Sequence, residues 1–363
     1  MKKILVATGG GDCPGLNAVI RGISRAAKHI GDIEVWGSME AFNGILCDPV
    51  DLVRLNKRRT AGIHVKGGTI IRTTNKGNPL SYPTLQPDGT FVNVDRSDEL
   101  IDKIRNNGFD AVINIGGDGS QKISLGLYNK GLNIIGVPKT IDNDLSATDR
   151  TFGFATAVQI ATDCFDKLVT TAESHHRVII MEVMGRDAGW IALHTAIAGG
   201  AEMCLIPEIP YDVKQVVKKI NKRYTKGRGF ANIVISEGAR VKDGTVTGKA
   251  ASDGDAHVKL GGVANVLRHQ LESNGCKGQV RSTILGHIQR GGTPSAYDRI
   301  LATSMGVKAL EMVVAQQFGE MVSFKNNTIT SVSLESAVSE YNYVDEKNYL
   351  VDVARKMGIS FGD

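Results

Sequence analysis

Several features of membrane, secreted and nucleic-acid-binding proteins are absent from this chain of 363 residues. No stretch approaches the roughly 18 consecutive apolar residues that a transmembrane helix needs. The segment between Met1-Lys2-Lys3 and Gly9 is too short for the apolar core of a signal peptide. Lys and Arg number 43 against 38 Asp and Glu, and no basic run greatly exceeds residues 57–59. We therefore expect no membrane and no nucleic-acid partner, whereas a weak positive field suits small anionic molecules.

Cysteine is also scarce, and its spacing argues against a CxxC motif and against a cysteine metal site. The five cysteines are odd in number, far apart and without a CxxC or metal-ligand spacing: Cys13, Cys47, Cys164, Cys204 and Cys276. Reduced thiols and a cytoplasmic location are the corresponding predictions. Glycine, by contrast, is abundant at 42 residues without a Gly-x-y period. Turns and close approach of backbone to ligands are the remaining reasons for such an excess.

Short apolar runs alternate along the chain with amphipathic stretches. The runs are rich in Val and Ile, as in parallel strands covered by helices on both faces. We predict a doubly wound α/β fold, and the length favours two domains with a change near residues 151–153. The predicted strands are residues 4–8, 111–115, 134–137, 178–183, 203–206, 232–236 and 282–285. The predicted helices are residues 16–30, 98–107, 120–129, 155–171, 188–198, 213–224, 260–273 and 297–315.

The candidate site comprises the loops that follow the predicted strands, because open α/β sheets bind ligands beyond their carboxyl ends. The first such loop contains Gly9, Gly10 and Gly11 and leads into a helix, which suits a phosphate group. A tight turn without a ligand is the alternative. The spacing is not the dinucleotide GxGxxG, and residues 286–293 lack the lysine of a GxxxxGK[ST] loop.

Two further loops carry carboxylates. In residues 116–120, Asp118 stands at a strand end, where a hard oxygen ligand for Mg²⁺ belongs, and Ser120 is placed to cap the next helix. In residues 138–144, Asp142 and Asp144 lie two positions apart beside Lys139 and Thr140. One carboxylate can accept a proton while the other assists a metal, as phosphoryl transfer requires. Ordinary turns are the alternative for either loop alone.

Cationic side chains lie near the ends of two later strands. They are Arg177, Arg186, Arg281, His287 and Arg290. Isolated arginines are usually solvated or paired on the surface. Several at strand ends suit an anionic substrate, because arginine binds phosphate through two hydrogen bonds.

Five segments, taken in order, resemble the 6-phosphofructokinase family: GGGDCPGLNAVIRG from Gly9, GGDGS from Gly116, PKTIDND from Pro138, HHRVIIMEVMGRDAG from His175 and LGHIQRGGTPSAYDR from Leu285. The resemblance extends from residue 1 to about 310. It implies two unequal doubly wound α/β domains with mostly parallel sheets and an active site in the cleft between them. Residues 1–153 with about 290–339 would form the larger, nucleotide- and metal-binding domain. Residues 154–289 with about 340–363 would form the smaller, sugar-phosphate-binding domain.

The implied activity is Mg²⁺-dependent transfer of the γ-phosphoryl group of ATP to the 1-hydroxyl of fructose 6-phosphate, a step of glycolysis. Residue by residue, the resemblance makes Asp142 the general base, Thr140 a hydroxyl beside the transferred phosphate, Asp118 the Mg²⁺ ligand and Asp144 a second acid. The implied catalytic set is completed by Lys139 and Lys76. The implied donor site is Gly11, Arg72, Lys76, Gly117, Asp118, Gly119 and Ser120. The implied sugar-phosphate site is Thr140, Asp142, Arg177, Met184, Gly185, Arg186, Glu237, Arg281, His287 and Arg290. Arg177 and Arg281 match arginines that the family inserts from a neighbouring subunit, which implies a homo-oligomer, usually a tetramer or dimer.

Four positions bear on the phosphoryl donor. ATP-dependent members of the family have Gly at the position of Gly119, whereas pyrophosphate-dependent members typically have Asp, which crowds the nucleotide's α-phosphate. Lys139 is usual in pyrophosphate enzymes. We expect ATP, because a missing side chain makes room for a nucleotide, and pyrophosphate is the alternative. The family usually has Gly at the position of Arg72 and, near Lys76, an arginine that contacts the transferred phosphate. We assign that contact to Lys76, and Arg72 is the alternative, either as the replacement or as a side chain that intrudes into the donor pocket.

A further set of residues bears on regulation. An inter-subunit site for ADP or phosphoenolpyruvate in bacterial relatives is matched by Arg21, Arg25, Glu202, Lys226 and Arg228. An arginine of that site is Val169 here, so we predict blunted or absent control. NAD kinase-like enzymes also have a GGDG loop, but a NAD kinase-like function would not explain the arginines near the ends of the later strands. A sugar-phosphate sensor would not need the acids at Asp118 and Asp142. Acceptors such as sedoheptulose 7-phosphate stay open, and residues after about 316 carry no recognisable site signal.

Overall fold

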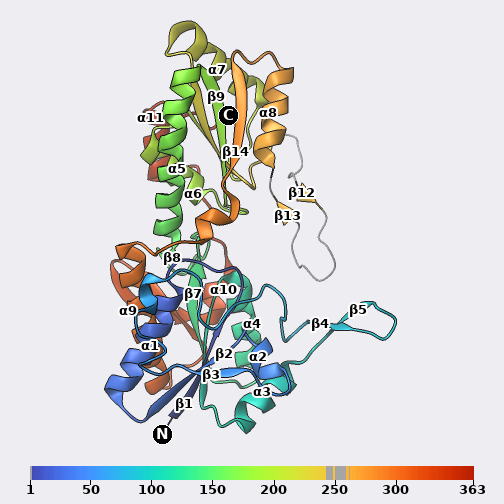
Figure 1. Ribbon diagram of the computed structural model, residues 1–363, viewed down its shortest axis with the longest axis vertical. Coiled ribbons are helices and arrows are strands. Elements are labelled where there is room, and N and C mark those ends of the chain that lie inside the picture. Colours follow the sequence, from blue (N-terminus) through green and yellow to red (C-terminus); the bar gives the residue numbers. More distant parts are fainter. Residues whose placement is uncertain (1, 243–247, 250–258, 261) are drawn as a thin grey trace.

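Two separate sheets organise the chain, the larger in the lower half of Figure 1 and the smaller in the upper half. The computed structural model describes residues 2–242, 248–249, 259–260 and 262–363. Both sheets are mostly parallel, and helices alternate with strands along the chain. The predicted α/β class is confirmed.

The larger sheet has the strand order β16-β15-β7-β6-β1-β2-β3, and β8 pairs with β7 outside this path. Neighbours are parallel except at the two edges, where β3 and β16 run antiparallel to the strands beside them. The strands are β1 (Lys2–Thr8), β2 (Ile33–Ser38), β3 (Leu52–Arg54), β6 (Ala111–Gly116), β7 (Ile134–Thr140), β8 (Phe152–Gly153), β15 (Glu320–Lys325) and β16 (Thr328–Ser333).

Helices cover both faces of this sheet, as alternate residues of β1 demonstrate. Ile4 and Val6 belong to one core, to which α1 (Leu16–Ile30) and α9 (Ala296–Val314) contribute. Leu5 and Ala7 belong to a second core on the other face. The helices of that second core are α2 (Asn43–Leu46), α3 (Ser97–Asn106), α4 (Asp118–Asn129) and α10 (Leu334–Ser339). A strand with both faces buried explains why the apolar run is continuous instead of alternating.

The smaller sheet has the strand order β10-β11-β9-β14, and all its neighbours are parallel. Its strands are β9 (Arg177–Val183), β10 (Met203–Leu205), β11 (Ala231–Ser236) and β14 (Gln279–Ile284). Met181 and Val183 pack toward α5 (Phe154–His175) and α6 (Trp190–Gly199). Val178 and Ile180 pack toward α7 (Val213–Lys226) and α8 (Val263–Ser273). The C-terminal helix α11 (Tyr349–Lys356) contacts α6.

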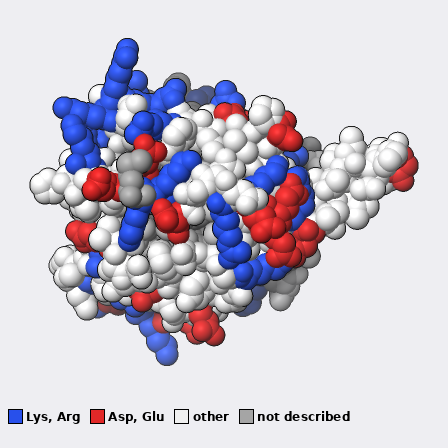
Figure 2. All heavy atoms as spheres, turned by 90° about the horizontal axis from the view of Figure 1, so that it is seen from below, with Lys and Arg blue, Asp and Glu red and all other residues white. Residues whose placement is uncertain are grey.

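Short elements lie outside these sheets. The hairpin of β4 (Tyr82–Leu85) and β5 (Phe91–Val94) projects from the body and is mostly uncharged in Figure 2. A second pair is β12 (Gly248–Lys249) with β13 (Lys259–Leu260), and two 3₁₀ helices are η1 (Ile63–Val65) and η2 (Gly286–Arg290). Within the part of the chain described, no helix is both long enough and apolar enough to cross a membrane.

The chain passes from the larger to the smaller sheet after β8. After β8 it enters α5, which packs on the smaller sheet. Asp298 of α9 is fully buried and fastens the start of α5, because its Oδ2 accepts hydrogen bonds from the Thr156 N–H at 2.7 Å and the Thr156 hydroxyl at 2.5 Å. This carboxylate therefore links helices that serve different sheets.

Several local predictions were wrong. Strand β2 was missed because Glu34 and Gly37 interrupt its apolar run, and β15 lies in the segment without a recognisable signal. Helix α8 begins at Val263 rather than at 260, because Leu260 ends β13, and residue 261 lies outside the described residues. Ser120 is not the cap of α4: that helix begins at Asp118, after Gly117.

Candidate functional site

The loop after β7 brings two carboxylates into a buried environment. Thr140 ends the strand, and its Oγ1 accepts a hydrogen bond from the Asp142 N–H at 3.0 Å. Asn143 turns the loop with a φ of 54°, and its Oδ1 accepts a hydrogen bond from the Thr151 N–H at 3.0 Å. The Oδ1 atoms of Asp142 and Asp144 are buried, and neither has a hydrogen-bond partner among the described residues. Two carboxylate oxygens are thus left available to a ligand.

Burial and neighbouring charges raise the pKa of both acids. For Asp142 the largest cause is burial, and the negative charges of Glu237 and Asp187 act in the same direction. The positive charges of Arg290 and Lys139 partly oppose this rise in the pKa of Asp142. For Asp144, burial is again the largest cause of a raised pKa, followed by the charge of Asp142. Carboxyls with pKa values raised toward neutrality are suited to proton transfer.

Asp118 lies near this pair but on a different element. It is the first residue of α4, not a strand end, so it stands at the positive end of that helix. Its Oδ2 accepts a hydrogen bond from the Tyr341 hydroxyl at 2.7 Å and pairs with the Lys122 ammonium at 2.9 Å. The charge of Asp118 contributes to the raised pKa of Asp144. Three of the predicted acids therefore share one region.

The glycine loop after β1 lies against two cations. The Lys139 ammonium donates a hydrogen bond to the Gly11 carbonyl, and burial lowers the pKa of this lysine. Arg290 Nη1 donates a hydrogen bond to the Asp12 carbonyl at 3.2 Å. A Cβ on Gly11 would lie 2.8 Å from that same Nη1, so a side chain at this position would displace the guanidinium. The loop predicted for nucleotide phosphates therefore contacts an arginine predicted for sugar phosphate.

The second glycine loop joins β6 to α4. Gly117 packs close to the Lys139 carbonyl, 3.2 Å from a Cβ built on the glycine. A Cβ on Gly119 would meet nothing within 4 Å, so the space in front of this residue is open. Ser120 turns inward, since a Cβ on Gly116 would lie 2.2 Å from its Oγ. Ser120 thus supports the backbone of the loop.

Arg72 occupies a conformation that favours glycine. Its φ is 56°, and its carbonyl accepts a hydrogen bond from the Thr8 hydroxyl at 2.6 Å. A left-handed conformation costs a non-glycine residue roughly 1–2 kcal/mol, which gives a physical reason for the glycine expected here from the family pattern. The exposed guanidinium lies 3.4 Å from Glu40 Oε1.

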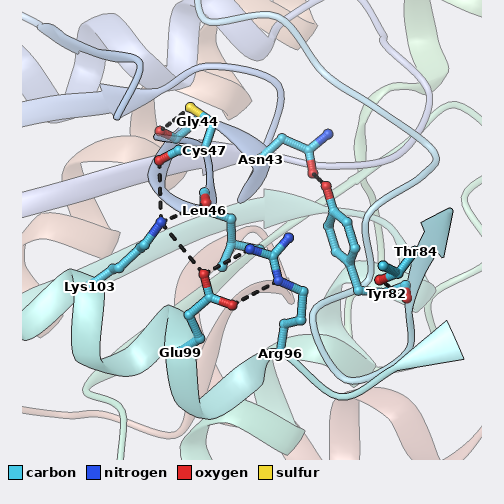
Figure 3. Close-up of polar contacts among 9 residues, drawn as sticks. All are labelled: Asn43, Gly44, Leu46, Cys47, Tyr82, Thr84, Arg96, Glu99 and Lys103. Atoms are coloured by element: carbon cyan, nitrogen blue, oxygen red, sulfur yellow. Dashed lines mark hydrogen bonds and ion pairs between the residues drawn. The ribbon is translucent and has the colours of Figure 1, made fainter. Parts of the chain in front are cut away.

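Lys76 lies on the exposed part of the same loop, ahead of the projecting hairpin. The next residue, Gly77, packs against the Asn43 side chain, and the Tyr82 hydroxyl donates a hydrogen bond to Asn43 Oδ1 at 3.1 Å (Figure 3). Arg96, just before α3, lies over the Tyr82 ring at 4.8 Å and pairs with Glu99 of α3 at 2.7 Å (Figure 3). The base of the hairpin is therefore anchored to α2 and α3, which fixes the backbone next to Lys76.

Loops from the smaller sheet face the acids. Met184, Gly185 and Arg186 follow β9, and the Glu237 N–H donates a hydrogen bond to the Val183 carbonyl at 2.9 Å. Burial raises the pKa of Glu237. Gly185 has a φ of 129°, and a Cβ there would lie 2.5 Å from Ser236 Oγ. The Met184 N–H donates a hydrogen bond to Gln289 Oε1 at 3.4 Å, which ties this loop to η2, the element that carries exposed His287 and half-buried Arg290.

Two predicted arginines are not brought to this end of the sheet. Arg177 is the first residue of β9, at the opposite end of the strand from Met184, and its Nε donates a hydrogen bond to Gln279 Oε1 at 2.9 Å. Arg281 is exposed on β14, in register with Ile179. Within one chain these side chains point to surface positions away from the acid loop.

The residues matched to an effector site are also divided. Arg21 and Arg25 belong to α1, whereas Lys226 ends α7, and these helices lie in opposite halves of Figure 1. On the smaller half, Glu202 pairs with Arg223 at 2.8 Å, and Arg228 pairs with Glu173. Val169 packs against the core from α5. Within one chain this set is therefore not assembled in one place.

Residues 341–344 were missed by sequence reasoning and lie beside the acids. Tyr341 contacts Asp118, and the Asn342 Nδ2 donates a hydrogen bond to the Asn143 carbonyl at 2.8 Å. Glu208, also missed, accepts a hydrogen bond from the Val344 N–H at 2.8 Å. Asparagine favours turns, so the place of Asn143 between two acids could have predicted the turn of this loop. Nothing in the sequence marked the C-terminal segment.

The acids fit a magnesium site at which a bound ligand supplies the remaining coordinating oxygen atoms. No group of three or more His, Cys, Asp or Glu side chains suited to a metal occurs in the described ranges. Mg²⁺ commonly uses one or two carboxylates together with substrate phosphates and water. Asp118 and the unpartnered Asp144 Oδ1 supply hard oxygen atoms of that kind.

Similarity to known proteins extends over the whole chain. The phosphofructokinase family model matches residues 3–313. ATP-dependent 6-phosphofructokinase 2 of Clostridium perfringens is 48% identical, covering 100% of this chain and 99% of that protein. ATP-dependent 6-phosphofructokinase of Chloroflexus aurantiacus is 44% identical, covering 100% and 98%. The structure of phosphofructokinase from Saccharomyces cerevisiae aligns with a TM-score of 0.77 and 29% identity, over 98% of this chain and 47% of that one. A pyrophosphate-dependent phosphofructokinase from Nitrosospira multiformis shares the fold, with a TM-score of 0.80, 22% identity and coverage of 98% and 90%. The chain therefore belongs to the phosphofructokinase family.

Proposed function

We propose that this chain is an ATP-dependent 6-phosphofructokinase of glycolysis, which converts fructose 6-phosphate and ATP to fructose 1,6-bisphosphate and ADP. The observation that carries the proposal is the buried, unpartnered Oδ1 of Asp142, in a loop of the larger sheet whose pKa-raising neighbours Glu237 and Asp187 follow strands of the smaller sheet. Full-length relatives at 44% and 48% identity that bear the name ATP-dependent 6-phosphofructokinase support it. Membership of this family also favours a sugar-phosphate kinase over a NAD kinase-like enzyme.

The chemical step needs one proton acceptor and good alignment. The 1-hydroxyl oxygen of the sugar forms a bond to the γ-phosphorus while the bond from that phosphorus to the β–γ bridging oxygen breaks. The hydroxyl proton moves to the Asp142 carboxylate, and ADP leaves with the bridging oxygen. Thr140 lies beside the reacting groups, and its hydroxyl orients the Asp142 backbone. Such a loose transition state is stabilised mainly by positioning and charge.

Cations and backbone amides hold the two substrates in this scheme. The donor phosphates lie along the loops of Gly11, Gly117 and Gly119, where backbone N–H groups and the end of α4 attract negative charge. Lys76, Arg72 and Lys139 add positive charge on that side. The sugar phosphate is held by Arg186, His287 and Arg290, with Met184, Gly185 and Glu237 shaping its site. Arg290 contacts the donor loop and so aligns the two sides.

Magnesium is the proposed cofactor. When bound, it neutralises the charge that develops on the β- and γ-phosphates. Asp118 would hold it, and Asp144 would lie on its acceptor side. The open space at Gly119 leaves room for the nucleotide's α-phosphate.

A steady-state assay with two donors tests the function. With Mg²⁺ and fructose 6-phosphate, the chain is expected to turn over with ATP and to show little turnover with pyrophosphate. Product formation at the 1-position is followed by ³¹P NMR. Efficient turnover with pyrophosphate and none with ATP would contradict the proposed donor, and phosphorylation of NAD instead of the sugar would contradict the acceptor. Sedoheptulose 7-phosphate in the same assay measures acceptor breadth.

We also propose two domains, residues 1–153 with about 290–339 and residues 154–289 with about 340–363, each built around one sheet. The acids lie where loops from the two meet. The cytoplasmic location indicated by cysteine usage stays a prediction, as does blunted control by ADP or phosphoenolpyruvate. Strong activation by ADP in saturation curves would contradict the latter.

Arg177 and Arg281 are proposed to complete the sugar-phosphate site of a neighbouring subunit, because each lies away from the acids of its own chain. Arg177→Ala and Asp142→Asn chains, each nearly inactive alone, are expected to regain activity when co-expressed and purified as hybrids. A hybrid oligomer then contains sites with both groups intact. If hybrids are as inactive as the parents, the arginine does not cross between subunits.

The acid pair predicts the pH dependence. Burial, as the largest cause, raises the pKa of Asp142 to about 6 and that of Asp144 to about 7. A general base acts only when ionised, so kcat/KM for fructose 6-phosphate is expected to fall as the pH drops below about 7 and to level off above it. Asp187→Asn removes a negative charge that raises the pKa of Asp142, so the acidic limb should move to lower pH. A limb that stays in place or moves upward would show that another group controls it.

A further inference from the structure

Residues 341–344 form a strap across the acid loop. Tyr341 pairs with Leu145 in an antiparallel bridge, and the Asn342 N–H donates a hydrogen bond to the Asp144 carbonyl at 2.9 Å. The Asn342 side chain reaches the Asn143 carbonyl at 2.8 Å. Asp144 and the residue on each side of it, Asn143 and Leu145, are therefore bonded to the strap.

The strap is also fastened to the elements of the smaller sheet. The Trp190 indole N–H, at the start of α6, donates a hydrogen bond to the Asn342 carbonyl at 2.7 Å. Glu208 accepts hydrogen bonds from the Val344 N–H at 2.8 Å and from the Gly189 N–H at 3.0 Å. These anchors follow the Asn342 N–H and the bridge of Tyr341 precedes it, so the backbone next to Tyr341 has little freedom.

Tyr341 directs its hydroxyl from this strap to Asp118. The hydroxyl donates to Oδ2 at 2.7 Å and accepts a hydrogen bond from the Lys122 ammonium at 3.3 Å. Lys122 also lies over the Tyr341 ring, 5.1 Å from its centroid, and contacts the same Oδ2 at 2.9 Å. One carboxylate oxygen is thus occupied by protein groups, which leaves the other oxygen of Asp118 as the one free to face a cation.

We propose that Tyr341 is a positioning residue whose hydroxyl orients the Asp118 carboxylate toward a divalent cation. The strap fixes the position of that carboxylate relative to the loop of Asp142 and Asp144. The inference rests on the proposed function, in which Asp118 holds the metal. Hydrogen-bond partners of metal ligands fix ligand orientation, and their loss typically costs about 10–100-fold in metal affinity or activity.

Binding of Mn²⁺ to the full chain in the presence of ATP tests this, with free Mn²⁺ measured by electron paramagnetic resonance. Tyr341→Phe removes only the hydroxyl and is expected to weaken Mn²⁺ binding about 10–100-fold. ATP affinity without metal should be unchanged. Saturating Mg²⁺ should restore kcat, with KM for fructose 6-phosphate as in the wild type. The matched control is Tyr343→Phe, since the Tyr343 ring is tilted against that of Tyr341, with 5.8 Å between the ring centroids, and is half exposed.

Equal Mn²⁺ affinity in Tyr341→Phe and the wild type would overturn the inference, as would an equal loss in Tyr343→Phe. Loss of activity that high Mg²⁺ does not restore would also overturn it, because that result indicates a merely structural role. These outcomes differ from failure of the proposed function. In that case the wild-type chain itself does not phosphorylate fructose 6-phosphate with Mg²⁺ and ATP.

Discussion

Replacing Asp142 with asparagine is expected to lower kcat for fructose 6-phosphate phosphorylation by about 10²–10⁴-fold, the usual contribution of a positioned general base. The amide keeps the shape of the carboxylate but cannot take the proton from the sugar's 1-hydroxyl. KM for ATP should change little, because the donor phosphates are assigned to the glycine loops. Steady-state kinetics at pH 8, where the wild-type acid is ionised, measures the effect.

Thermal unfolding separates this loss from damage to the fold. The pKa of Asp142 is raised in the folded chain, so its contribution to stability is present at low pH and is lost as the pH rises through about 6. An uncharged amide avoids that loss, and Asp142→Asn should unfold at pH 8 no more readily than the wild type. Asp166→Asn, on the exposed face of α5, is the matched control for kinetics and unfolding. Transfer at a near wild-type rate in Asp142→Asn would show that the base is assigned wrongly.

The second large effect concerns the phosphoryl donor. Gly119→Asp is expected to reduce kcat/KM for ATP by about 10²–10³-fold, because two like charges roughly 4 Å apart near a protein surface repel by about 4 kcal/mol. The fold should tolerate the change, since a Cβ at this position meets nothing within 4 Å and an acid in the first turn suits a helix. Assays with ATP and with pyrophosphate, together with the melting temperature, measure it.

Gly119→Ala is the control for size without charge. It should lose much less ATP activity than Gly119→Asp, and both variants should melt close to the wild type. Equal losses in the two variants would mean that bulk alone matters at this position. Unchanged use of ATP in Gly119→Asp would mean that Gly119 does not face the nucleotide.

The core strands and the acid loop were predictable from the sequence for a physical reason. A strand buried on both faces, such as β1, must be continuously apolar, and the residues after it must form the binding edge of a parallel sheet. The grouping of Asp118, Asp142 and Asp144 follows from that rule because β6 and β7 are neighbours.

Other parts of the site depend on tertiary contacts that leave no local pattern. Tyr341 reaches Asp118 from a segment that forms only an isolated bridge, so no strand or helix periodicity marks it. The left-handed backbone of Arg72 was hidden because a long cationic side chain occupies a position suited to glycine.

A crystal structure of the chain with Mg²⁺, a non-hydrolysable ATP analogue and fructose 6-phosphate tests the central claim most directly. The sugar's O1 is expected to lie within roughly 2.6–3.2 Å of an Asp142 carboxylate oxygen, with the γ-phosphate in line beyond it. Asp118 should contact the metal, and Arg290 should lie between the donor loop and the sugar phosphate. A sugar bound with O1 turned away from Asp142, or a nucleotide seated away from Gly119, would contradict the account.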